Sequence, residues 1–176
     1  MKVVFEKIYE KYHRDLFQYI FYIVKDKSLT EDLVQEVYVR VLKSYSSFRR
    51  ESSEKTWLFS IARHVTIDYF RSQSRKRKRF LPFFDWNEKE QIIQDKNPMP
   101  EEIAIQSEEM QTIYKYLDTC TPDQKSILIL RYIQSFSIKE TAEILNFTES
   151  KVKTTQHRAL KTLKKHLTKG GDADEI

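Results

Sequence analysis

A stretch of basic and polar side chains near the C-terminus is the part of this sequence best equipped for chemistry. An α-helix over residues 151–161 would expose seven of them, namely Lys151, Lys153, Thr154, Gln156, His157, Arg158 and Lys161. Such side chains contact the phosphates and the base edges of a DNA major groove. The stretch therefore predicts binding to duplex DNA, and within it Arg158 and Lys153 could each read a base or only touch a phosphate.

The residues before this helix supply the frame that a helix-turn-helix requires. Ser137 followed by Glu140 has the capping-box pattern that opens a first helix. Ala142 is small enough for two helices to cross, and Asn146 tolerates the left-handed conformation of the turn. The expected buried positions are Leu145, Phe147 and Val152. The alternative is a helical hairpin with a merely solvated basic face, but cap, crossing residue, turn and basic face agree at one place.

A second basic cluster lies at residues 75–79, where five Lys or Arg residues follow one another. Basic residues at the C-terminal end of a helix are favourable against the helix dipole, so this cluster could be only a solvated helix end. Five in a row is more than capping requires. With a net charge of +5 at pH 7, the chain favours a polyanionic partner.

The sequence offers little that could catalyse a reaction. The only glycines are Gly170 and Gly171, so the sequence has no glycine-rich phosphate loop and no glycine-flanked nucleophilic serine. The four histidines and the single cysteine, Cys120, lack the spacing of a metal site. We predict a protein that is not an enzyme and needs no metal or cofactor. One cysteine excludes an internal disulfide, and without a signal-peptide pattern or a long apolar run the chain is predicted to be cytoplasmic.

Helices must position these side chains, because the chain is poor in turn formers and its apolar residues recur at helical spacing. Helices are expected over residues 3–25, 30–44, 54–73, 101–117, 122–133, 138–145 and 149–167. The capping-box pattern opens the second of them at Ser28 and the fifth at Thr121, with Gln124 closing the box. The predicted fold class is all-α, with two small helical domains over residues 1–79 and 101–169. A flexible linker, residues 80–100, would join them, and residues 170–176 would form a disordered tail. The apolar start of the linker, from Phe80 to Trp86, is expected to dock on a domain or a partner.

Two further segments, taken together with the helix-turn-helix, resemble a known family. The segment EDLVQEVYVRVL, residues 31–42, looks like the region of bacterial RNA polymerase sigma factors that docks on the coiled coil of the polymerase beta-prime subunit. Residues 48–71 resemble the part of sigma region 2 that recognises the −10 promoter element, and the helix-turn-helix resembles sigma region 4, which reads the −35 element. Order and spacing over residues 5–167 are similar to the extracytoplasmic-function (ECF) subfamily, in particular its SigX-type members.

The resemblance implies roles for the residues that match the family's motifs. Those implied to bind core polymerase are Asp32, Leu33, Gln35, Glu36 and Arg40. Those implied to bind the melted −10 strand are Phe48, Arg49, Ser53, Lys55, Arg63, His64, Arg71 and Arg75. Aromatic and cationic groups suit single-stranded DNA, because bases stack on rings and cations follow the backbone. Trp57 lies in the same region, but its spacing favours packing in the core.

Two positions depart from the family's pattern in the −10 region. Arg50 stands where a glycine is often found after Phe-Arg, and His64 stands where many members have asparagine. Either change could alter which base the region accepts.

The resemblance implies a sigma factor, a protein that binds core RNA polymerase and directs promoter-specific transcription initiation without making or breaking a bond. It also implies an envelope-stress-type regulon, no small-molecule substrate, and an anti-sigma factor, usually membrane-anchored, that holds the protein off. Two other classes fit parts of the chain. A free-standing helix-turn-helix regulator would bind duplex DNA alone, usually as a dimer, but leaves residues 31–42 unexplained. A helical adaptor would show no salt-dependent affinity for DNA.

Overall fold

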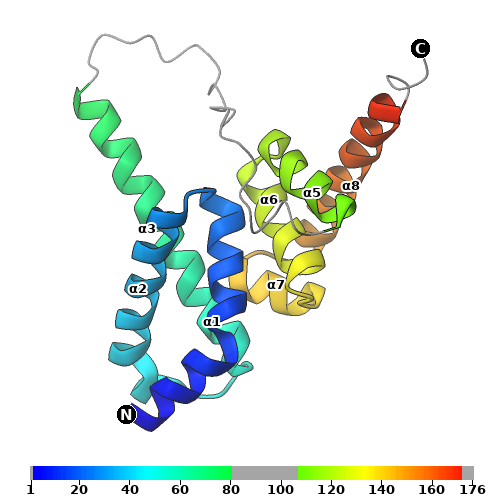
Figure 1. Ribbon diagram of the computed structural model, residues 1–176. Helices are drawn as coiled ribbons and strands as arrows, with labels where there is room; N and C mark the ends of the chain where they lie inside the picture. Colours follow the sequence, from blue (N-terminus) through cyan, green and yellow to red (C-terminus); the bar gives the residue numbers. More distant parts are fainter. Residues whose placement is uncertain (1, 81–106, 172–176) are drawn as a thin grey trace.

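The structure, a computed structural model, describes residues 2–80 and 107–171 (Figure 1). Within these two ranges every regular element is helical and no strand occurs, which confirms the predicted all-α class. Three predictions fall outside the described residues: the linker after Phe80 with its apolar cluster, the helix start at residues 101–106, and the tail from residue 172.

The N-terminal unit consists of three long helices and one short turn of helix. They are α1 (Lys2–Val24), α2 (Lys27–Ser44), the 3₁₀ turn η1 (Tyr45–Ser47) and α3 (Glu54–Phe80). Each long helix turns an apolar stripe inward, and the buried core includes Leu16 and Ile20 of α1, Val37 of α2, and Leu58 of α3. Burying a side chain of this size contributes about 1.5–3 kcal/mol, so these stripes hold the three helices together.

The start of α2 differs from the prediction. The helix begins at Lys27, and its cap is Asp26, whose carboxylate accepts a hydrogen bond of 2.8 Å from the Leu29 N–H. Ser28, the expected cap, lies inside the helix. The reason is the backbone of Lys25, which is left-handed with φ 54° and reverses the chain directly after α1. Asp26 is then extended and in the geometry that a cap requires.

The end of α3 also differs from the prediction, because the helix runs to Phe80 and not only to residue 73. The basic cluster at residues 75–79 is therefore helical. A helix of 27 residues is about 40 Å long. Figure 1 shows its C-terminal end projecting away from the other helices, which leaves Arg71 and Arg75 exposed.

The C-terminal unit is built from shorter helices and one long one. They are α5 (Glu108–Tyr116), η2 (Leu117–Thr119), α6 (Pro122–Leu128), the π-helical segment η3 (Ile129–Ile133), α7 (Ile138–Leu145) and α8 (Glu149–Gly171). Both predicted capping boxes are present, one between Thr121 and Gln124 and one between Ser137 and Glu140. The last helix continues through Gly171, so the predicted tail at residues 170–176 starts at least two residues too early.

The two units pack against each other, with α7 against α3 and η3 against α1 (Figure 1). Buried residues form one continuous cluster across both units, and Phe136 of the C-terminal unit packs edge-on against Phe59 of α3. The sequence predicts two domains joined by a linker, and it does not indicate this contact between them.

The charge of Lys125, in α6 of the C-terminal unit, should affect the stability of the fold. Burial lowers the pKa of Lys125 to about 8, and the charge of Lys25 adds to this effect. The unfolded chain therefore binds more protons than the folded one between pH 8 and 10.5. Burying the charged Lys125 ammonium destabilises the fold, and this destabilisation is fully present below pH 8 and becomes smaller as the pH rises. We expect Lys125→Met to raise the free energy of unfolding at pH 7 by about 1–3 kcal/mol.

Urea unfolding at pH 7 and pH 9 measures this effect. The advantage of Lys125→Met should be about 1 kcal/mol smaller at pH 9, since one pKa unit corresponds to about 1.36 kcal/mol. Lys139→Met, at an exposed position of α7, is the matched control and should change stability little at either pH. An advantage of equal size at both pH values would contradict the assignment to ionisation.

Candidate nucleic-acid interface

The helix-turn-helix expected from the sequence is formed by α7 and α8. Asn146 adopts the left-handed conformation, with φ 55° and ψ 44°, and ends α7. The Phe147 N–H then donates to the Ala142 carbonyl at 2.9 Å, and the Thr148 hydroxyl accepts from the Lys151 N–H at 3.1 Å to cap α8. Ala142 and Val152 are buried where the two helices meet. The hydrogen bonds of this turn thus fix the direction of α8 relative to α7.

Five of the seven predicted DNA contacts are exposed on the outer face of α8. They are Lys153, Thr154, His157, Arg158 and Lys161. Gln156 lies toward the core and is partly buried, because its side-chain oxygen accepts a hydrogen bond of 2.9 Å from Nε of Arg131. Lys151 is also exposed, but it forms an ion pair of 3.2 Å with Asp123, and its Nζ lies 3.5 Å from the centre of the Phe147 ring.

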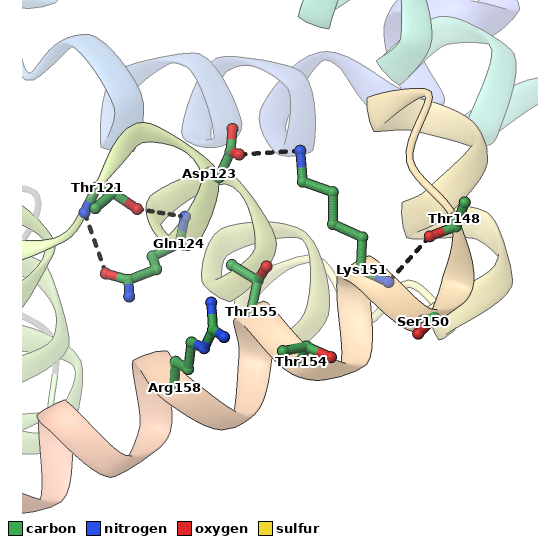
Figure 2. A pocket seen from close by; sticks show the side chains of 9 residues that line it. All are labelled: Thr121, Asp123, Gln124, Thr148, Ser150, Lys151, Thr154, Thr155 and Arg158. Atoms are coloured by element: carbon green, nitrogen blue, oxygen red, sulfur yellow. Dashed lines mark hydrogen bonds and ion pairs between the residues drawn. The ribbon is translucent and has the colours of Figure 1, made fainter.

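A polar hollow of about 550 Å³ lies between the start of α6 and the first turns of α8. Figure 2 shows Arg158 reaching from α8 toward the capping box at the start of α6, with Thr154 and Thr155 beside it. The Asp123 carboxylate also lines the hollow, where Lys151 neutralises it, and a guanidinium beside hydroxyl and amide groups suits a phosphate oxygen. The hollow therefore extends the basic face of α8 onto α6, through Thr121 and Gln124, which the sequence indicates only as a helix cap.

The −10 residues predicted on the N-terminal unit divide into two groups, of which the first is open to solvent. Arg49, His64, Arg71 and Arg75 are exposed. Phe48 is half-buried and stacks on Trp57 at 4.7 Å between ring centres, so Trp57 does pack, as its spacing predicts. Three exposed arginines thus accompany an aromatic pair in this region, and cations with aromatic rings are the combination that binds single-stranded DNA.

Ser53 has a structural task in this region. Its hydroxyl accepts a hydrogen bond of 3.1 Å from the Thr56 N–H and so caps the start of α3. Arg50, at the position where the family often has glycine, has a positive φ of 59°. This is the conformation that glycine adopts freely, and a non-glycine residue adopts it at a cost of roughly 1–2 kcal/mol. The loop backbone therefore keeps a glycine-like turn, although the residue at this position is arginine.

The second group, Lys55 and Arg63, lies against the C-terminal unit and is only partly exposed. Lys55 forms an ion pair of 3.2 Å with Asp15, and its Nζ lies 5.1 Å from the centre of the Phe136 ring. Arg63 donates a hydrogen bond of 3.0 Å to the Ser126 hydroxyl. Two predicted −10 residues are thus in contact with side chains of the other unit.

The predicted polymerase-binding residues lie on α2, with one correction. Asp32, Gln35 and Glu36 are exposed on the same helix. Leu33 is only 6% exposed and belongs to the hydrophobic core, so in this structure its side chain is not on the polymerase-binding surface that the sequence predicts. It shares the inward stripe of α2 with Val37, four residues later, and α2 packs this stripe against α1 and α3.

Arg40 is held by two carboxylates, at 3.0 Å from Glu36 and 2.9 Å from Asp68 of α3. The sequence does not indicate that Asp68 holds Arg40 or that Arg131 holds Gln156. Their partners are 28 and 25 residues away, respectively, and no local pattern marks such a pair. Only the packing of the helices brings these groups together.

The described part of the chain offers neither a metal site nor a membrane span. No group of three or more His, Cys, Asp or Glu residues in it is arranged to hold a metal ion. None of its helices has the length and apolar character needed to cross a membrane.

The sequence matches two family models, one for each unit. They are Sigma-70 region 2 over residues 8–76 and Sigma-70, region 4 over residues 110–163. The chain is 56% identical over 167 residues to the ECF RNA polymerase sigma factor SigX of Bacillus subtilis (strain 168), covering 95% of this chain and 85% of the relative. It is 33% identical over 171 residues to the RNA polymerase sigma factor YlaC of the same organism, covering 97% and 96%.

Solved structures share the arrangement of helices. The sigma factor RpoE of Bartonella quintana, crystallised in complex with the anti-sigma factor NepR, matches with a TM-score of 0.71 and 26% identity over 93% of this chain and 96% of that one. CnrH, solved in complex with the cytosolic domain of CnrY, matches with a TM-score of 0.67 over 99% of this chain and 92% of that one. At 18% identity, the second match shows a likeness of fold alone.

Proposed function

This chain belongs to the extracytoplasmic-function subfamily of RNA polymerase sigma factors, and on that premise we propose that it binds core RNA polymerase and directs initiation at promoters with specific −10 and −35 elements. The family consists of transcription regulators. The protein would confer sequence specificity on the polymerase and would not itself carry out a covalent step.

The single observation that carries the DNA-binding part is the exposed basic face of α8. Lys153, His157, Arg158 and Lys161 are exposed on the second helix of a helix-turn-helix whose turn is fixed by Asn146. A second helix presented in this way enters the major groove. We assign it to the −35 duplex, with Arg158 and the hollow beside it on the phosphate backbone.

The N-terminal unit would carry the other two tasks. The exposed acidic and polar side chains Asp32, Gln35 and Glu36 would bind the coiled coil of the polymerase beta-prime subunit. The exposed cations from Arg49 to Arg75, with the Phe48 and Trp57 rings, would hold the melted −10 strand. Capturing unstacked bases offsets part of the few kcal/mol that unstacking costs, and this would favour the open promoter.

We further propose that the protein works in the cytoplasm, where polymerase meets DNA, and that an anti-sigma factor holds it off until an envelope-stress-type signal arrives. The likeness to RpoE, which was crystallised with the anti-sigma factor NepR, supports control by such a partner. A membrane-anchored anti-sigma factor would keep the chain at the membrane surface.

In vitro transcription from a promoter library, with core RNA polymerase and with or without this chain, tests the proposal. We expect the chain to select a subset of promoters that share a −35 and a −10 element, with a transcript yield about tenfold or more above that of core alone. Folding of the protein is checked by circular dichroism. A folded chain that stimulates no promoter would refute the proposal, and specific retardation of a short duplex by the chain alone would favour a free-standing regulator.

A further inference from the structure

Lys151 differs from the other cations of α8 that are predicted to bind DNA. Lys153, Arg158 and Lys161 form no ion pair with any residue that the structure describes. Nζ of Lys151, in contrast, lies 3.2 Å from the carboxylate of Asp123, in the first turn of α6. An acidic side chain thus lies beside the proposed DNA-binding face and neutralises one of its cations.

The position of Lys151 on α8 explains why it pairs with α6. Side chains of a helix lean toward the helix N-terminus, and Lys151 is in the first turn of α8, which begins at Glu149. Each residue advances a helix by about 100°, so Lys153 lies on nearly the opposite side from Lys151. Figure 2 shows the Lys151 side chain extending from α8 to Asp123.

A second group holds the same ammonium. The centre of the Phe147 ring lies 3.5 Å from Nζ of Lys151. Phe147 belongs to the turn between α7 and α8, where its N–H is bonded to the Ala142 carbonyl. A cation is attracted both by the face of an aromatic ring and by a carboxylate. An ammonium that already has these two partners gains less from a DNA phosphate than an unpaired one does.

Asp123 also sets the charge of the hollow between α6 and α8. The charged side chains that line the hollow are those of Lys151, Arg158 and Asp123, and the other lining residues are neutral. Two cations and one acid give the lining a net charge of +1, and removal of the acid would raise it to +2. A phosphate that binds Arg158 therefore approaches a carboxylate of like charge, which weakens its binding.

We propose that Asp123 withholds Lys151 from DNA, so that the −35 duplex is bound with one phosphate contact fewer than the cations of α8 could make. The inference rests on the proposed binding of the −35 duplex by α8. Phosphate contacts strengthen binding to every DNA sequence alike. Asp123 therefore lowers the affinity of the chain for DNA in general, and less of the chain is retained on DNA that contains no promoter.

Asp123→Asn, which removes the charge and keeps the size of the side chain, tests the proposal. Anisotropy of a fluorescent duplex carrying a −35 element recovered from the library measures affinity, with the full chain bound to core polymerase. We expect binding to become tighter by about tenfold at 50 mM salt and about threefold at 200 mM, because one added phosphate contact changes the slope of log affinity against log salt by about −0.9. The ion pair is half exposed and partly screened by water, which limits the gain.

Lys151→Ala, made in the wild-type chain and in Asp123→Asn, assigns the added contact to Lys151. In the wild-type chain this substitution should leave the salt slope unchanged, because Lys151 makes no phosphate contact there. In Asp123→Asn it should return the slope to the wild-type value. Asp123→Glu retains a carboxylate and should also keep the wild-type slope. A merely structural role of Asp123 would not change the number of phosphate contacts that the slope reports.

Glu149→Gln is the matched control. It makes the same change in net charge at an exposed acid in the first turn of α8 that has no ion pair in the described part of the chain. Its salt slope should equal that of the wild type. A duplex of scrambled sequence is measured in parallel, and Asp123→Asn should raise affinity for it by the same factor. Circular dichroism checks that every variant is folded.

A wild-type salt slope in folded Asp123→Asn would overturn this inference alone. A shallower slope for Lys151→Ala in the wild-type chain would also overturn it, since Lys151 would then bind a phosphate in spite of Asp123, and this measurement does not depend on the folding of Asp123→Asn. A gain confined to the −35 sequence would contradict the assignment to a phosphate. If the wild-type chain with core did not prefer the −35 duplex to the scrambled one, the proposed role of α8 would fail as well.

Discussion

Reversing two charges on α2, with Asp32→Lys and Glu36→Lys in one chain, is expected to lower the affinity for core RNA polymerase by about a hundredfold. Both side chains are exposed on one face of α2, four residues apart. Exchanging a close attraction for a repulsion at an interface changes binding by several kcal/mol, and each 1.4 kcal/mol is roughly a factor of ten. The stability of the fold should change little, because neither side chain belongs to the core.

Competition against labelled wild-type chain for core polymerase measures the loss. Glu6→Lys with Glu10→Lys is the matched control, since these two exposed acids of α1 have the same spacing and give the same change in net charge. The control should keep its affinity within about threefold. Equal losses in both double variants would mean that the total charge of the chain, and not the face of α2, governs binding. Arg40 retains Asp68 as a partner in the variant, so the contact between α2 and α3 survives.

Removing two cations from α8, with Lys153→Ala and Arg158→Ala together, is expected to weaken binding of the −35 duplex by about a hundredfold. Each contact to a base or a phosphate is worth roughly 1–3 kcal/mol. If both residues bind phosphates, the slope of log affinity against log salt should also become less steep by about two. Measurements use core polymerase carrying the full chain, on a promoter recovered from the library, across a range of salt concentrations.

The same helix provides the control. Lys164→Ala with Lys165→Ala removes two exposed cations that lie about 9 Å or more beyond Arg158 along α8, at a rise of about 1.5 Å per residue, and should change affinity much less. If the control lost as much as the test variant, the basic face near the turn would have no special role. Affinities for several promoters distinguish base reading from phosphate binding. Loss of a base contact relaxes the sequence preference at one promoter position, whereas loss of a phosphate contact lowers the affinity for all promoters alike.

Features that depend on near neighbours could be predicted from the sequence. The caps at Thr121 and Ser137, the left-handed turn at Asn146 and the burial of Val152 are all present as expected. In each case, the groups involved lie within one or two helical turns, where hydrogen bonds and steric limits act on the residues in sequence. The all-α class followed from apolar spacing in the same way.

Features that depend on side-chain direction were less predictable. Leu33 and Gln156 lie at the margins of exposed helix faces, and a rotation of a fraction of a turn decides whether such a residue faces solvent or the core. Leu33 faces the core, and Gln156 turns toward Arg131. The cap of α2 is Asp26 and not Ser28 because the left-handed Lys25 shortens the connection from α1. These outcomes depend on how neighbouring helices pack, which a single segment does not specify.

The sequence by itself determined the basic helix, its helix-turn-helix frame and the acidic face of α2, because each is a local pattern on one helix. Only the tertiary structure decided which side chains of the chain are exposed and which contact another helix. It placed Lys55 and Arg63 against the C-terminal unit, paired Lys151 with Asp123, and joined Lys25, which follows α1, to Asp118 of the other unit. The physical reason is that burial and ion pairing depend on distance in space, and helices far apart in the sequence establish those distances only when they pack.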